Sequence, residues 1–578
     1  MRQFKRAVHL TVLGTLLWSS AAAVGSGGSD EQHCAYYEAG TKQVYWGDLH
    51  VHSGFSLDAW GYGTARTPRE AYGFARGAPT ILPGGHAVQL ERPLDFMSVT
   101  DHAEWFDLMS LCTDPNWSEN AYCRTLTEKN TPATGREVFT EYVLPTITKA
   151  NPQPAQLCVD QPARCAASMQ QQWRRIQRQA HQANRPCEFT AFVGFEWSAT
   201  PDYSHTHRNV IFASENVTSE PIDYLRYPSP DKLWQELDQR CLRAEGCDVL
   251  VIPHNTNMGD GKSFDVETES ADLRSRRARY EKLIEIHQEK GNSECLPAYG
   301  QADEDCGFET ILTRHSQPTA ATDFTAEEWQ RMRGTYVRRL LLRGLRAYDQ
   351  SGGETPNPLQ LGIIGSTDNH AGTGGFVEED QWLGSVFGIG DFERTMARRS
   401  WNPGGLVAVW AEENTRSSIF AALSRREVYA TSGPRLRLRF MAATEPLSCD
   451  GPPPEHAVTM GGELSGRGER YFMVHAQYDR TPLRAIEIVK GSYRQGELRE
   501  QVKGIWQRDG GGLDVCVTWQ DDAFDYQAPA FWYARVHEAP TPRWSARHCR
   551  QAGRCDEFRD ADVSISERAW SSPIWNLP

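Results

Sequence analysis

The chain has 578 residues, more than one ordinary domain holds, so two or three folded units are expected. Its residues are 39% hydrophobic and 24% charged, and 18 are tryptophan, which is typical of a globular protein with a large core. The formal charge of −14 argues against nucleic acid as a partner. The sequence also predicts no internal membrane span, because no internal apolar run is long enough.

The N-terminus has the layout of a secretory signal peptide. Arg2, Lys5 and Arg6 precede the mostly apolar run Ala7–Trp18, and the small residues Ala21–Ala23 follow. This order of basic, apolar and small residues predicts a signal peptide over residues 1–23. We therefore expect an exported protein, either periplasmic or secreted.

The cysteines support the same compartment. All 14 follow the predicted cleavage point, and an even number in an exported protein indicates disulfides. Close spacing predicts small stapled loops for five pairs, namely Cys112/Cys123, Cys158/Cys165, Cys241/Cys247, Cys295/Cys306 and Cys549/Cys555. The sequence leaves the pairing of four others open, namely Cys34, Cys187, Cys449 and Cys516.

Short β-rich runs alternate with helical segments through most of the chain. In chain order the predicted strands are Val44–Leu49, Leu94–Thr100, Thr190–Glu196, Asn209–Ala213, Asp248–Pro253, Leu283–His287 and Leu361–Thr367. Predicted helices between them include Ser168–Ala183, Lys232–Ala244 and Ala326–Tyr348. This alternation predicts a parallel α/β architecture, and the predicted strands are numerous enough to close a barrel.

Two further features of the sequence are long connections between the predicted elements and a loss of helical pattern near the C-terminus. The connections Ala103–Cys187 and Asn255–Arg279 are long, and Gly372–Asn402 is a third candidate; such segments often form lids or pocket walls. After Gly433 short alternating segments dominate, namely Tyr471–Ala476, Ala485–Val489, Asp514–Trp519 and Ala530–His537. We expect a barrel domain over 24–434 and a small β-sandwich-like domain over 435–578.

Histidines and carboxylates gather at the C-terminal ends of the predicted strands, where α/β barrels carry their active sites. Residues i and i+2 of an extended chain point the same way, so His50 pairs with His52 and Asp368 with His370. The other candidates are Asp58, Asp101, His102, Glu196, His205, His207 and His254. Each alone is weak evidence, but together they predict a metal centre. Imidazole with carboxylate suits zinc, manganese or iron.

The order HxH, TDH, a Glu after an apolar strand, His, PH and DxH resembles the PHP superfamily, named for polymerase and histidinol phosphatase. The resemblance covers about Val44–Gly433. Within that superfamily the chain looks like a large, often exported bacterial subgroup labelled as a domain of unknown function. The resemblance implies a distorted (β/α)7 barrel, here with long insertions, that holds two or three divalent metal ions.

The resemblance also implies a set of ligands. The implied metal ligands are His50, His52, Asp58, His102, Glu196, His207, His254, Asp368 and His370. Between the two neighbouring histidines, His207 is favoured over His205 because it directly precedes a predicted strand.

Three carboxylates are expected to take part in catalysis, namely Glu196, Asp368 and Asp101. Glu196 and Asp368 are candidates to bridge two ions, which together can generate a hydroxide near neutral pH. Asp101, like Asp48, is expected to hold a ligand imidazole, with simple turn capping as an equal alternative.

Three functions remain open from the sequence. The favoured one is hydrolysis of small organic phosphate mono- or diesters by metal-bound hydroxide, as the PHP resemblance implies. A metal centre also cleaves amides, lactones or carboxylic esters. An anionic phosphate substrate should need basic pocket residues, for which Arg208, Lys262 and Arg314 are candidates. The third function is non-catalytic binding of metal or of a polymer.

Overall fold

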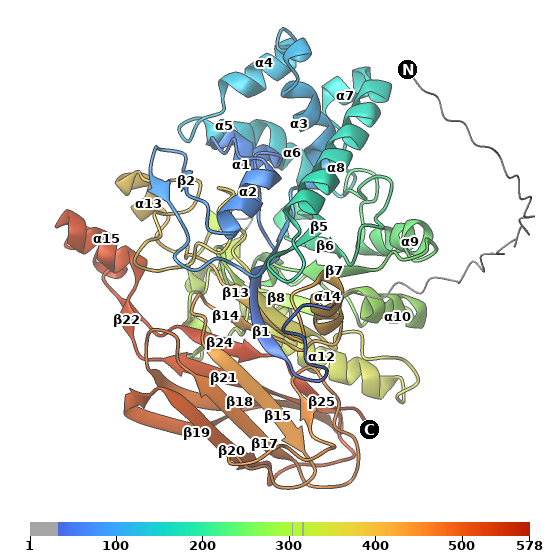
Figure 1. Cartoon of the computed structure of the whole chain (residues 1–578), viewed down its shortest axis with the longest axis vertical. Helices are drawn as coiled ribbons and strands as arrows, with labels where there is room; N and C mark the ends of the chain where they lie inside the picture. The colour runs from blue at the N-terminus through green and yellow to red at the C-terminus, as the bar shows by residue number, and fades with distance from the viewer. Residues whose placement is uncertain (1–32, 303–304, 315–316) are drawn as a thin grey trace, which may run out of the picture.

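The structure is a computed structural model that describes residues 33–302, 305–314 and 317–578. The predicted signal peptide lies outside these residues. Figure 1 shows the helices α3 to α8 at one end of the molecule and the C-terminal strands at the other. Among the described helices, none combines the length and apolar character that a membrane span requires.

A mixed sheet of 12 strands runs through the chain in the order β19-β18-β21-β24-β14-β13-β1-β4-β5-β6-β7, with β25 paired to β21. Its first strands are β1 (Gln43–Asp48), β4 (Phe96–Val99), β5 (Thr190–Trp197), β6 (Arg208–Phe212), β7 (Val249–Pro253), β13 (Leu406–Ala411) and β14 (Val428–Thr431). Its C-terminal strands are β18 (Leu483–Arg494), β19 (Glu497–Gly512), β21 (Ala530–Glu538), β24 (Arg568–Ser571) and β25 (Ile574–Asn576).

Two smaller sheets accompany the large one. The first contains β12 (Gly362–Gly365), β8 (Leu283–Gln288) and β9 (Gly291–Asn292). The second contains β16 (Val458–Thr459), β15 (Arg437–Ala443), β17 (Tyr471–Gln477) and β20 (Asp514–Gln520). The rings of Phe472 on β17 and Trp532 on β21 lie 5.2 Å apart, so the second small sheet packs against the large one.

The expectation of a parallel sheet is only partly right. Strands β1, β4 and β5 are parallel, and so are β8 and β12. In contrast, β6 is antiparallel to both β5 and β7, and β13 is antiparallel to β1. The connection from β5 to β6 lacks the α-helical crossover that a parallel pair needs, so β6 returns alongside β5.

The barrel and the two-domain division stay predictions. An isolated parallel bridge joins Val51, after β1, to Asn369, after β12, and so brings the first small sheet against the large one. Strand β24 pairs with β14 across the predicted boundary at 434/435. The large sheet is therefore shared by both predicted domains.

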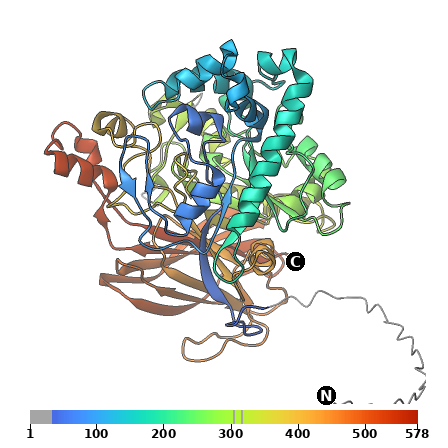
Figure 2. The same cartoon turned by 45° about the horizontal axis from the view of Figure 1, so that its top comes forward.

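Helices cover the sheet where the site lies. The long connection after β4 forms α3 (Phe106–Cys112), α4 (Ala121–Glu128), α5 (Gly135–Val138), the π-helical turn η3 (Phe139–Val143), α6 (Leu144–Ile147), α7 (Gln156–Asp160) and α8 (Pro162–Ala183). Later helices are α9 (Pro230–Arg240), α10 (Ala271–Tyr280), α11 (Ala326–Arg333), α12 (Val337–Gln350), α13 (Phe392–Ala397), α14 (Arg416–Ser424) and α15 (Trp544–Ala552). Two short helices, α1 (Leu57–Gly61) and α2 (Pro68–Ala75), follow β1. Figure 2 shows the α3–α8 layer above the sheet.

One predicted helix is divided in the structure, and one further helix was not predicted. The predicted helix Ala326–Tyr348 is two helices, α11 and α12, because Gly334 and the β-branched Thr335 weaken the helix between them. Helix α15 was not expected within the predicted β-rich region. The residue directly after it, Gly553, has a positive φ of 66°, which is common where a helix ends.

All 14 cysteines form disulfides, and the five predicted close pairs are confirmed. The four remaining cysteines pair as Cys34–Cys187 and Cys449–Cys516. The Cys34–Cys187 bridge spans a sequence separation of 153 residues and ties the segment before β1 to the end of the helical insertion. A long closed loop of this kind restricts the unfolded chain most.

Candidate metal centre

Four buried side chains converge where β1, β5 and β12 end. His50 and His52 follow β1, Glu196 lies on β5, and Asp368 follows β12. The Nε2 atoms of both histidines lie 3.2–3.4 Å from Glu196 Oε2 and Asp368 Oδ1. Among the described residues, none of these four atoms has a hydrogen-bond partner, although all are buried.

This arrangement fits a divalent cation. Four ligand atoms about 2.0–2.1 Å from a tetrahedrally coordinated ion lie about 3.3–3.4 Å from one another. A buried polar atom without a partner costs about 1–3 kcal/mol, so four in one place need a common partner. A shared cation satisfies all four atoms at once.

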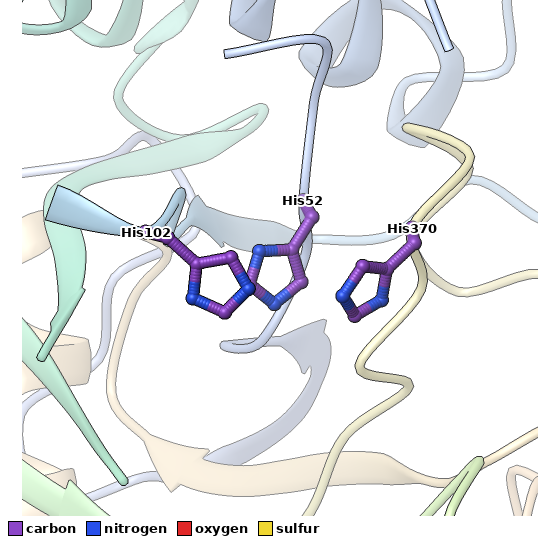
Figure 3. A group of neighbouring side chains, drawn as sticks. All are labelled: His52, His102 and His370. Atoms are coloured by element: carbon purple, nitrogen blue, oxygen red, sulfur yellow. The ribbon is translucent and has the colours of Figure 1, made fainter. Parts of the chain in front are cut away.

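A second group of ligand-type atoms surrounds Asp58. Its Oδ2 lies 3.2 Å from His102 Nε2 and 3.1 Å from His370 Nε2. Asp58 lies in the short helix α1. Burial opposes its ionisation, but attraction to both imidazoles outweighs burial and holds the pKa of the carboxyl well below its usual value. Figure 3 shows His52, His102 and His370 side by side, brought together from the ends of β1, β4 and β12.

A third group shares Glu196. Its Oε1 lies 2.6 Å from His207 Nδ1 and 3.3 Å from His254 Nε2, while its Oε2 belongs to the first group. A carboxylate that faces two groups of histidines is suited to bridging two ions. Burial raises the pKa of Glu196, but attraction to the surrounding imidazoles holds it well below the usual value. His205 stacks on His207 with ring centroids 4.7 Å apart.

All nine predicted ligands therefore lie in one contiguous cluster, and their roles as ligands are part of the proposal below. The chemistry of the set, six imidazoles and three carboxylates, suits a borderline divalent cation such as zinc, manganese or iron.

Neighbouring acceptors orient two of the imidazoles. His50 Nδ1 lies 3.0 Å from Glu285 Oε2, and His52 Nδ1 lies 2.9 Å from Ser56 Oγ. A carboxylate only accepts hydrogen bonds, so Ser56 Oγ donates its proton to Asp101 Oδ1 at 2.8 Å. Ser56 Oγ must then accept a hydrogen bond from His52 Nδ1. In both histidines the proton is then on Nδ1, and the Nε2 lone pair is free for a cation.

Asp101 influences the site through Ser56. It also accepts from the Ser53 backbone and hydroxyl at 2.6 and 2.7 Å, and it is fully enclosed. Burial raises the pKa of Asp101, although the two serines oppose that rise. Asp48, by contrast, accepts hydrogen bonds from backbone N–H groups, including that of Gly375 at 2.9 Å. These contacts correspond to the turn capping that was the alternative role for Asp48. A direct catalytic role for Asp101 stays a prediction.

Sequence reasoning missed Glu285 and Lys290. Glu285 is a carboxylate inside the apolar strand β8, and a charged residue within such a strand could have indicated a role in the site. The Lys290 ammonium, which follows β8, contacts Asp368 Oδ2. His287, on the same strand as Glu285, packs instead against Phe308 and Trp570 at ring distances of 5.6 and 5.9 Å.

A cavity of about 310 Å³ opens beside the cluster. Its cationic lining residues are Arg136, Lys290 and Arg398. The three basic residues that the sequence suggested for binding an anionic substrate do not line the cavity. Two of them pair with other side chains, and the third is exposed to solvent. Arg208 is buried against Glu281 at 2.8 Å, Arg314 pairs with Glu328 at 3.1 Å, and Lys262 is exposed outside the cavity lining.

The family described as "Protein of unknown function (DUF3604)" matches residues 39–510 and 503–578. The chain belongs to this family, which confirms the resemblance to a subgroup labelled as a domain of unknown function. No curated protein matches the chain. A solved two-domain protein from Bacteroides vulgatus, described as containing a predicted PHP-like metal-dependent phosphoesterase, is similar at 12% identity over 88% of this chain and 94% of that chain. The TM-score is 0.29, too low to support a conclusion about the site.

Proposed function

We propose that the chain is a metal-dependent hydrolase that cleaves small organic phosphate esters, with two or three divalent ions held by the nine-residue cluster. The observation that carries the proposal is the set of four buried, unpartnered atoms on His50, His52, Glu196 and Asp368. Divalent ions bound there supply polarisation of an ester oxygen and a nucleophile at neutral pH.

The chain's own residues favour an anionic substrate. Arg136, Lys290 and Arg398 line the cavity beside the cluster and offset the carboxylates of the same lining, namely Asp58, Glu196 and Asp368. The Lys290 ammonium lies against Asp368, so it offsets part of the negative charge that would otherwise repel a phosphate. Glu285 and the Ser56–Asp101 pair hold two imidazoles in fixed orientations, which limits reorganisation during the reaction.

The disulfides support a place for this activity. Seven bridges with all cysteines paired suit an oxidising compartment, so we propose that the protein is exported to the periplasm or the medium. Hydrolysis of phosphate esters there would release phosphate outside the cytoplasm.

The test is a comparison of substrates on one preparation. The chain from Val24 onward, purified without chelators and reconstituted with Zn²⁺, Mn²⁺ or Fe²⁺, is assayed on p-nitrophenyl phosphate, bis-p-nitrophenyl phosphate and p-nitrophenyl acetate. We expect phosphoester turnover that falls at least about 10³-fold in His50→Ala. The matched control is His456→Ala, an exposed histidine outside the cluster, which should keep full activity.

Two outcomes would overturn the phosphoesterase proposal. Turnover of the acetate with none of either phosphoester would favour a hydrolase of carboxylic esters, amides or lactones. Bound metal with no turnover of any ester would favour a binding protein.

A further inference from the structure

The cavity beside the cluster has an apolar wall that the chemistry of ester cleavage does not require. Phe139, Val143, Leu144 and Ile147 line it from one continuous helical run, η3 and α6. Val143 and Ile147 are also part of a separate hydrophobic core that the helical insertion forms with α1. The wall is therefore held by its own packing and gives the cavity a fixed apolar face.

Aromatic side chains line the cavity next to His370. The Phe387 ring lies 6.4 Å from the His370 ring, 4.5 Å from the Tyr62 ring and 5.0 Å from the Trp401 ring. The Tyr62 and Trp401 rings meet Phe387 edge-on, at interplanar angles of 84° and 76°, an arrangement that aromatic side chains favour. The cavity thus joins the candidate metal centre to a group of aromatic surfaces.

One cation in this aromatic group has no polar partner. The Arg398 guanidinium carbon lies 4.5 Å from the centre of the Phe387 ring and 5.7 Å from that of Trp401. Among the described residues, its guanidinium has no hydrogen bond and no ion pair, although it is partly buried. The nearby arginines differ, because Arg394 faces Asp391 at 3.9 Å and Arg399 pairs with Asp560 at 2.7 Å.

Arg136 lies on another part of the cavity lining and, unlike Arg398, is exposed. Its guanidinium also lacks an ion pair among the residues that the structure describes. Two like charges near Tyr62 repel each other, and burial and this repulsion both lower the pKa of Arg398. An anion placed between them would remove the repulsion and recover the cost of a partly buried cation.

We propose that the cavity selects aryl phosphate esters, with the anionic group between the ligand cluster and Arg398 and the aromatic group between the apolar wall of η3 and α6 and the Phe387 ring. The proposal rests on the proposed function only for the position of the ester beside the cluster. Burial of a phenyl ring favours an aryl group over a smaller one, and charge-assisted hydrogen bonds from a guanidinium favour an anion over a neutral group.

The test is a binding measurement that needs no turnover. Calorimetry on the metal-reconstituted chain compares phenylphosphonate, whose carbon–phosphorus bond resists hydrolysis, with methylphosphonate. We expect phenylphosphonate to bind at least about tenfold more tightly, since only it fills the apolar part of the cavity. Arg398→Gln should weaken phenylphosphonate about tenfold or more, and Arg136→Gln should act in the same direction.

Two further variants separate the contributions. Leu144→Asn should reduce the preference for phenylphosphonate over methylphosphonate while leaving methylphosphonate affinity near that of the unaltered chain. Arg394→Gln, on helix α13 and outside the cavity lining, is the matched control and should change neither affinity. Thermal unfolding of each variant checks that the fold is kept.

The outcomes distinguish this inference from the proposed function. Equal affinity for the two phosphonates, or unchanged binding in Arg398→Gln, would overturn the aryl selectivity even if phosphoesters are hydrolysed. Arg398-dependent binding of phenylphosphonate without phosphoester turnover would support the ligand class and reject the proposed reaction.

Discussion

Two buried clusters of charge illustrate different uses of the same side chains. In the first, Glu294 accepts hydrogen bonds from Arg338, Tyr533 and Arg535 on one oxygen and from Trp570 on the other, at 2.7–3.0 Å. In the candidate metal centre, the buried atoms of two histidines and two carboxylates face one another with no hydrogen-bond partner among the described residues.

The difference teaches how to tell a structural cluster from a binding site. Arg338 comes from α12 and Arg535 from β21, so Glu294 joins the central part of the chain to the C-terminal strands through fully satisfied polar atoms. A buried network whose polar atoms all have hydrogen-bond partners stabilises a fold and has no free atom with which to bind a ligand. Converging buried atoms without partners indicate that another atom belongs between them.

The largest effect should come from the bridging carboxylate. Glu196→Gln keeps the shape of the side chain but removes the charge that faces two groups of histidines. We expect phosphoester turnover to fall at least about 10³-fold and bound metal to decrease, with an unchanged circular dichroism spectrum. Full activity in this variant would show that the three groups do not act as one centre.

The satisfied network should respond in stability rather than activity. Glu294→Gln leaves Arg338 and Arg535 buried without their full countercharge, so the free energy of unfolding should fall by about 3–5 kcal/mol. Denaturant titration measures the loss, and metal content of the folded protein should not change. Glu497→Gln is the control, since its pair with Arg499 at 2.8 Å is exposed and should contribute about 0–1 kcal/mol.

Acid should weaken the same network. Burial raises the pKa of Glu294, but attraction to Arg535 and Arg338 outweighs burial, so the folded-state pKa is well below the ordinary value of 4.5. The stabilisation is fully present above the unfolded value and is lost as pH falls toward the folded value. The melting temperature should therefore drop more between pH 5 and about pH 3 in the unaltered chain than in Glu294→Gln. Equal drops would mean that other carboxylates dominate.

The smallest effect should come from a residue that only orients a ligand. Ser56→Ala removes the hydroxyl that links His52 to Asp101, so His52 loses its fixed tautomer. Metal affinity should fall about 10–100-fold, as measured by competition with a chromogenic chelator. Ser53→Ala is the comparison, because the Ser53 hydroxyl donates to Asp101 and, among the described residues, makes no hydrogen bond with His52. A larger loss in Ser53→Ala would contradict the relay through Ser56.

Much of the site followed from one simple rule of strand geometry. The seven predicted strands are all present, with ends that differ by no more than two residues, so residues next to those ends were placed correctly. His50 and His52 converge because alternate residues of an extended chain face the same side. Close cysteine pairs were predictable because few residues separate them.

The remainder depended on contacts that sequence spacing does not encode. Glu285 reaches His50 from a strand 235 positions away, and Lys290 reaches Asp368 from another connection. The direction of β6 was missed because helix and strand alternation says little about a short return connection. The cations of the cavity were missed because Arg136 and Arg398 lie on long connections, whose paths no periodicity predicts.

The most direct test of the central claim is elemental analysis of the chain purified from Val24 without chelators, alongside the double variant His50→Ala/Asp368→Ala. The account predicts two or three equivalents of zinc, manganese or iron in the unaltered chain and a clear loss in the variant. Absence of stoichiometric metal in the unaltered chain, even after reconstitution with each ion, would contradict the account.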